Sequence, residues 1–186
     1  MKKDLNHLST EELGKLFPII ISDYNPQWKT LFQLEKEKIV RSLGNDSILC
    51  IEHIGSTAIP KLKAKPTIDI LIEMKKDSNI DNIRKELHKL DYQYIHKPEN
   101  PPPHMMFAKG YTINGFAGQA FHIHLRYKGD CDEKLFRDFL LKNPYIAKEY
   151  EEVKVHLAQK YKNDREAYTE GKSEFIKNII NLAKSQ

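Results

Sequence analysis

Residues 120–127 alternate strictly between two kinds of side chain, which is the pattern of a β-strand that packs one face on a core. The apolar side chains, which we expect to face the core, are Phe121, Ile123, Leu125 and Tyr127. The opposite face presents two imidazoles and a guanidinium in one row, from His122, His124 and Arg126, with Ala120 ahead of them. The alternation therefore predicts a sheet with a core on one side and a histidine-bearing polar face on the other.

Other strands are expected in the middle of the chain, and helices at both of its ends. Residues 48–54 and 67–74 are rich in β-formers, and weaker strands are expected at residues 92–96 and 105–113. Helical spacing covers residues 9–17, 25–44, 79–90, 132–142, 144–161 and 168–183. The chain has 186 residues and shows no internal repeat, which fits one domain of ordinary size. We therefore predict a single α+β domain over residues 1–186.

The composition excludes several classes of protein. No window of about 18 uncharged apolar residues is present, which excludes a membrane span, and the N-terminus leads into no apolar segment of a secretory signal. The two cysteines, Cys50 and Cys131, form no CxxC motif, so we expect no disulfide scaffold and a cytoplasmic location. The net charge is only +4, and the basic residues are spread along the helices. We therefore expect an anionic small molecule or nucleotide as the partner, and no membrane or specific nucleic acid.

A candidate anion site lies where the strand at residues 48–54 ends in Gly55-Ser56 and a short basic connection follows. Gly55 allows the backbone to approach a phosphate closely. The backbone N–H groups of Ser56 and Thr57 would point at that anion if they open a helical turn. Lys65, near the end of the connection, would neutralise its charge. The alternative is an ordinary turn, because glycine and serine are common in turns.

Asp69, in the strand at residues 67–74, is the candidate partner of the histidine row. It is flanked by isoleucines, and a carboxylate there is costly to bury unless it is paired or bound to a metal. A His-x-His pattern on a strand presents two imidazoles on one face, about 6.6 Å apart at the backbone. We expect Asp69, His122 and His124 to hold a divalent metal or to transfer protons, with His53 as a further candidate ligand. The alternative is a pair of half-exposed histidines on a polar sheet face.

Two other segments are candidates to border this site. Residues 97–104 are rich in proline and predict a loop over it. In the C-terminal helices, Tyr150 and Lys154 are four residues apart, as are Tyr168 and Lys172, so each pair shares a helix face. Packing of the lysine stems on the rings is the ordinary explanation. The functional alternative is a basic wall over the sheet site.

Several motifs of the chain resemble the GrpB family in their order and spacing. They are Tyr24-Asn25-Pro26-Gln27-Trp28, His53-Ile54-Gly55-Ser56-Thr57-Ala58-Ile59-Pro60, Ala64-Lys65-Pro66-Thr67-Ile68-Asp69-Ile70, His122-Ile123-His124, Phe136-Arg137-Asp138-Phe139-Leu140 and Tyr168-Thr169-Glu170-Gly171-Lys172. The resemblance runs from about Pro18 to about Leu182. One departure is Lys61, where the family commonly has a glycine after the proline.

The resemblance implies a nucleotidyltransferase-like mixed β-sheet with flanking N-terminal and C-terminal helices. In that superfamily a Gly-Ser turn holds a triphosphate and an Asp-x-Asp strand holds magnesium, which prefers oxygen ligands. Thr67 falls at the first acidic position and Asp69 at the second, so this chain lacks one of the expected carboxylates. The histidine row could replace it, and imidazole suits zinc and other transition metals better than magnesium.

The resulting hypothesis is a nucleotidyltransferase-like protein that binds a nucleotide or another phosphate-containing small molecule and transfers at phosphate with the help of a metal. Its catalytic residues would be Asp69, His122 and His124, which would also ligate magnesium, manganese or zinc. Its phosphate-binding residues would be Gly55, Ser56, Thr57, Lys65 and Arg126. The alternatives are a catalytically inactive nucleotide- or metabolite-binding module, and a metal-dependent hydrolase that uses the two histidines.

Overall fold

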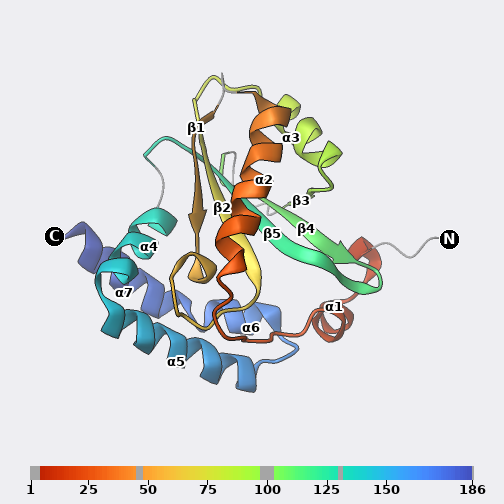
Figure 1. Ribbon diagram of the computed structural model, residues 1–186. Coiled ribbons are helices and arrows are strands. Elements are labelled where there is room, and N and C mark those ends of the chain that lie inside the picture. Colours follow the sequence, from red (N-terminus) through yellow and green to blue (C-terminus); the bar gives the residue numbers. More distant parts are fainter. Residues whose placement is uncertain (1–4, 45–47, 97–102, 130–131, 186) are drawn as a thin grey trace.

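The computed structural model describes residues 5–44, 48–96, 103–129 and 132–185. Its centre is a five-stranded sheet with the strand order β1-β2-β5-β4-β3 (Figure 1). The strands are β1 (Ile48–Ile54), β2 (Thr67–Met74), β3 (Gln93–Ile95), β4 (Met105–Thr112) and β5 (Gly115–Tyr127). Strands β2 and β5 pair in parallel, whereas the other neighbouring strands are antiparallel. The sheet is therefore mixed, as the resemblance implied.

Helices precede, interrupt and follow the strands. They are η1 (Leu5–His7), α1 (Thr10–Leu16), α2 (Gln27–Leu43), η2 (Ser56–Ala58), α3 (Ile80–Lys89), α4 (Asp132–Lys142), α5 (Pro144–Lys160), α6 (Arg165–Glu170) and α7 (Ser173–Lys184). Helices α4 to α7 gather beside the end of the sheet where β1 finishes, and α2 lies in front of the sheet, roughly along β1 (Figure 1). The α+β class predicted from the sequence is confirmed. Within the described residues, no helix is both long and apolar enough to cross a membrane.

Local sequence signals explain where several helices begin and end. The side chains of Ser9 and Glu12 each accept from the other's backbone N–H, which closes a capping box at the start of α1. Gly44, with a φ of 72°, ends α2 in a conformation that glycine adopts without strain. The predicted helix at residues 168–183 is instead divided between two helices. Helix α6 ends at Glu170, with Gly171 as its C-cap, and α7 begins at Ser173.

Two other predictions differ from the structure or fall outside it. Strand β5 begins at Gly115, earlier than predicted, because its first residues form a hairpin with the end of β4. Residues 97–102 of the proline-rich segment, and Cys131, lie outside the described residues.

The main core lies on the sheet face that α2 and α3 cover. From the sheet it takes the apolar sides of the two central strands, which are Ile68, Ile70, Ile72 and Met74 of β2, and Phe121, Ile123 and Leu125 of β5. Trp28, Phe32 and Ile39 of α2 pack against them. A second apolar cluster joins α4, α5 and α7 to Ile59 and Leu62, which lie in the connection between β1 and β2. That connection is therefore held between the sheet and the C-terminal helices.

Truncating the core of the central strands should destabilise the protein strongly. Ile70 and Ile123 are completely buried and face each other across the β2–β5 pair. Ile70→Ala or Ile123→Ala should lower the free energy of unfolding by about 2–5 kcal/mol, because each leaves a cavity between packed strands. Chemical denaturation measures this loss. Tyr145→Ala, at an 88% exposed position, is the control and should have little effect. Losses below about 1 kcal/mol at both isoleucines would contradict the packing described.

Candidate functional site

The parallel pairing of β2 with β5 brings three predicted site residues together. Asp69 lies opposite His122, and Leu71 lies opposite His124. Because side chains alternate along a strand, Asp69, His122 and His124 all project from the face opposite the α2 and α3 core. The Asp69 side chain is 26% exposed, so the cluster is partly open to solvent.

The three side chains converge on one carboxylate oxygen. His122 Nδ1 and His124 Nε2 each lie 3.3 Å from Asp69 Oδ1. One potential ligand atom from each of the three residues lies within 4.8 Å of the other two. Two imidazole nitrogens and a carboxylate are a donor set for zinc and other transition metals. The chemistry of the residues therefore fits a divalent transition metal better than magnesium.

The protonation states of the cluster favour this interpretation. Burial alone would raise the pKa of Asp69, but the hydrogen bonds from His122 and His124 hold it well below its usual range. Burial lowers the pKa of His122 to about 4, against the opposing effect of Asp69. At neutral pH the aspartate is therefore ionised and His122 is neutral, which are the states that metal ligands require.

A neighbouring side chain orients the His122 imidazole. The Tyr111 hydroxyl from β4 lies 2.8 Å from His122 Nε2, the nitrogen that points away from Asp69. Glu133 of α4 lies 4.0 Å from His124 Nδ1. A hydrogen-bond partner on the outer nitrogen, as Tyr111 is for His122, fixes the tautomer and the ring orientation of a metal-binding histidine. Sequence reasoning missed Tyr111, because its hydrogen bond to His122 depends on the β4–β5 pairing.

The Gly55 turn lies directly against the Asp69 carboxylate. Gly55 has a φ of 69° and a ψ of −172°, a region of backbone conformation that is essentially limited to glycine. A Cβ atom at this position would lie 2.5 Å from Asp69 Oδ2. Ser56, Thr57 and Ala58 form the 3-10 helix η2, which is one turn long. A helical turn therefore begins directly after Gly55, as the phosphate hypothesis required. Lys61 has a φ of 66°, so the connection keeps a glycine-like turn where the family commonly has glycine.

The structure assigns different surroundings to Thr57 and His53. The Thr57 hydroxyl is buried, donates to the Thr67 carbonyl oxygen at 3.2 Å and lies 2.9 Å from His53 Nε2. His53 pairs with Ile70 rather than with Asp69, and its ring stacks on Phe32 in the core between α2 and the sheet. His53 therefore lies on the opposite sheet face from His122 and His124. The prediction that it is a further ligand was wrong, because the β1–β2 register turns it away.

Arg126, two residues after His124 on the same strand face, is engaged by helix α4. Its guanidinium forms an ion pair with Glu133, with a nitrogen–oxygen distance of 2.6 Å, and donates to the Leu125 carbonyl oxygen at 2.9 Å. These contacts tie Arg126 to α4.

Three cationic side chains from the connection and the C-terminal helices form one electrostatic group with Asp69. Lys65, Arg165 and Lys172 are half-buried and interact electrostatically with one another or with Asp69. Burial lowers the pKa of Lys65 to about 7, with Arg165 and Lys172 lowering it further and Asp69 opposing them. Lys172 Nζ also lies 4.4 Å from the Tyr168 ring centroid. Lys172 thus matches the basic wall considered from the sequence.

The other predicted pair, Tyr150 and Lys154, is buried, and Lys154 Nζ lies 4.9 Å from the Tyr150 ring centroid, as the packing explanation predicted. Lys154 is buried, and its Nζ donates to the Lys63 carbonyl oxygen. Glu151 accepts from the Lys63 backbone N–H at 2.7 Å. Lys154 and Glu151 therefore both bind the backbone of Lys63, in the connection between β1 and β2 that also contains Lys65.

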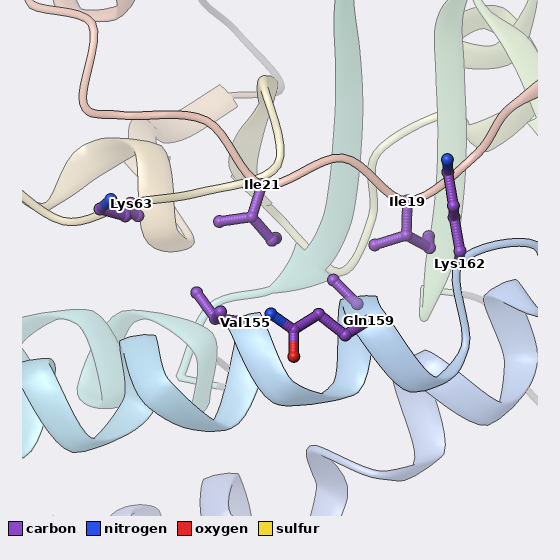
Figure 2. A pocket seen from close by; sticks show the side chains of 7 residues that line it. Ile19, Ile21, Lys63, Val155, Gln159 and Lys162 are labelled. Atoms are coloured by element: carbon purple, nitrogen blue, oxygen red, sulfur yellow. The ribbon is translucent and has the colours of Figure 1, made fainter.

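A groove on the outer side of this connection is separate from the cluster. Figure 2 shows it between the segment around Ile19 and Ile21 and helix α5, with Val155 and Gln159 on the helix side. Its volume is about 330 Å³. Neither Asp69 nor the two histidines line it.

The fold and the cluster define an α+β protein that carries an Asp-His-His group on one face of a mixed sheet. The chain belongs to the GrpB family, because the family model described as "GrpB protein" matches residues 18–182.

Curated relatives and solved structures agree with this membership. The chain is 40% identical over 161 residues to the UPF0157 protein PA4798 of Pseudomonas aeruginosa, covering 86% of this chain and 65% of that protein. It is 32% identical to the glutamate-rich protein GrpB of Alkalihalophilus pseudofirmus, covering 88% and 94% of the two chains. The crystal structure of GrpB from Enterococcus faecalis covers 88% of this chain and 96% of that chain, with a TM-score of 0.74 and 31% identity. The chain thus spans slightly less than two thirds of the length of the Pseudomonas relative.

Proposed function

We propose that the protein binds a nucleotide or another phosphate-containing small molecule at the Asp69 face of the sheet and acts in the manner of a nucleotidyltransferase. The observation that carries this proposal is the convergence of Asp69, His122 and His124 directly beside the Gly55 turn. A metal-ligating group and an anion-receiving turn then share one site. The proposal places this activity in the cytoplasm, in keeping with the cysteine usage.

Each group has a defined role in the proposed site. Asp69, His122 and His124 would hold a divalent metal, which would polarise a phosphoryl oxygen of the ligand. The backbone N–H groups of Ser56 and Thr57 would receive phosphate oxygens, since Gly55 adds no side chain in front of them. Lys65 would neutralise the same phosphate.

Isothermal titration of the protein with ATP, GTP, CTP and UTP tests the proposal in the presence of magnesium, manganese or zinc. We expect metal-dependent binding of at least one nucleotide, strongest with manganese or zinc because of the two imidazole ligands. His124→Ala should weaken that binding about tenfold or more, since it removes one of the three ligands. If no nucleotide bound under any of these conditions, the proposal that the protein recognises a nucleotide would be wrong.

Product analysis by mass spectrometry separates the proposed activity from its alternatives. Incubation with nucleotide and a mixture of small acceptors should yield a nucleotidylated product. Binding without any product would identify an inactive binding module, which the threonine at position 67 would explain. Release of phosphate or nucleoside monophosphate to water alone would identify a metal-dependent hydrolase.

A further inference from the structure

We propose that the candidate site holds a single metal ion, and that Lys65, Arg165 and Lys172 supply the positive charge that a second ion provides in two-metal phosphoryl-transfer sites. This proposal rests on the proposed function and specifies the chemistry of its site. It also specifies the ligand class, because so much fixed positive charge suits a polyphosphate better than a single phosphate.

The ligand geometry provides for one ion. Both imidazole nitrogens are directed at the same oxygen of Asp69, Oδ1, whereas Oδ2 lies against the Gly55 turn. Within the described part of the chain, Asp69, His122 and His124 are the one group of three or more metal-ligating side chains that converge in this way. Sites with two metals need carboxylates that bridge the ions. Here Thr67 stands two residues before Asp69, at the place of a second acid.

Two further carboxylates, Glu52 on this sheet face and Glu133 of α4, are held by cations of their own. Glu133 accepts from Arg126 at 2.6 Å. Glu52 of β1 lies 2.7 Å from Arg137 and also pairs with Lys134. These ion pairs link α4 to the sheet, through Arg126 of β5 and through Glu52 of β1. Because both glutamates are already paired, they offer no ready second set of ligands beside Asp69.

The three cations come from separate elements and meet beside the cluster. Lys65 precedes β2, Arg165 opens α6, and Lys172 lies between α6 and α7. The guanidinium carbon of Arg165 lies 5.5 Å from the ring centroid of Tyr111, the residue whose hydroxyl contacts His122. Arg165 also donates to the Phe17 carbonyl oxygen at 3.1 Å, which fixes its position.

These cations have little negative charge to balance them. Among the residues that the structure describes, none of the three is within 4.0 Å of a carboxylate oxygen. Lys65 and Lys172 both interact electrostatically with Asp69, which would also bind the metal. Mutual repulsion of this kind is relieved when a multiply charged anion binds. A triphosphate carries the negative charge that the metal and the three side chains together would neutralise.

Binding measurements with zinc and inorganic triphosphate test the proposal. Zinc per chain is measured by elemental analysis after equilibrium dialysis, without triphosphate and with it, and we expect one ion in both cases. Titration of the zinc-loaded protein with triphosphate is then compared for the wild type, Lys65→Met and Lys172→Met. Each substitution should weaken triphosphate binding by about tenfold or more, because it removes a charge-assisted contact. Zinc affinity should stay the same or become tighter.

Lys160→Met is the matched control. Lys160 is exposed, and its Nζ lies 5.0 Å from the Tyr161 ring centroid, much as Lys172 lies against Tyr168. This variant should bind triphosphate as the wild type does. If Lys65→Met or Lys172→Met lowers the melting temperature, the glutamine variant at the same position replaces it.

Two results would overturn this inference while leaving the proposed function in place. They are two zinc ions per chain in the presence of triphosphate, and unchanged triphosphate affinity in both folded lysine variants. Absence of zinc binding to the wild type would overturn the proposed metal site itself, and this inference with it.

Discussion

Asp69→Asn should abolish tight metal binding while leaving the protein folded. The substitution keeps the size and shape of the side chain but removes the negative charge on which His122 and His124 converge. Zinc affinity should fall by about 100-fold or more, because an amide is a poor replacement for an ionised carboxylate ligand. The free energy of unfolding should change by only about 1–2 kcal/mol, since two charge-assisted hydrogen bonds to a partly exposed group are weakened. Zinc titration and chemical denaturation of the same sample measure both effects.

Glu52→Gln provides a matched control for this prediction. Glu52 and Asp69 lie in neighbouring strands, both side chains are 26% exposed, and both are paired with basic groups. Glu52 is held by Arg137 and Lys134, and among the described residues no histidine forms an ion pair with it. Its substitution should leave zinc affinity unchanged. Equal zinc affinity of Asp69→Asn and the wild type would show that Asp69 is not a ligand.

Gly55→Ala should damage both the fold and the site. Its backbone conformation is one that residues with a side chain adopt only at a cost of about 1–3 kcal/mol. In addition, the new Cβ would lie 2.5 Å from Asp69 Oδ2, so the carboxylate or the turn must move. We expect the free energy of unfolding to fall by about 2–4 kcal/mol, combining strain and displacement. Zinc affinity should fall as well, because Asp69 Oδ1 moves away from the two imidazoles.

Gly118→Ala separates these two causes. Gly118 has a φ of 70°, close to that of Gly55, but a Cβ there would meet nothing within 4 Å. This control should lose only the conformational part of the stability, about 1–2 kcal/mol, and none of its zinc affinity. If Gly55→Ala matched Gly118→Ala in both measurements, the contact between the turn and the carboxylate would contribute neither to stability nor to zinc affinity.

Strand patterning in the sequence was sufficient to predict the faces of the central strands. The period-two alternation placed His122 and His124 together and Ile123 in the core, and both placements are confirmed. Alternation depends only on backbone geometry, so it can be recognised without knowledge of neighbouring strands. The parallel pairing of β2 with β5, which puts Asp69 opposite His122, depends on tertiary packing of segments about fifty residues apart.

The predictions that failed or were missed depend on contacts of that long-range kind. His53 lies on the wrong face for the cluster because of the antiparallel register of β1 on β2. The phosphate-binding role of Arg126 stays a prediction, but its ion pair with Glu133 was missed, because no local pattern indicated the position of α4. Arg165 was not assigned to the site, because only the folding of α6 against β4 brings it to Tyr111.

Anomalous diffraction from crystals grown with zinc tests the central claim, that Asp69, His122 and His124 form one metal site, most directly. We expect a single anomalous peak on the polar sheet face, about 2.0–2.2 Å from Asp69 Oδ1, His122 Nδ1 and His124 Nε2. The same peak should be missing from crystals of Asp69→Asn. A wild-type map with no peak among these three atoms, at a zinc concentration that saturates the protein in solution, would contradict the claim.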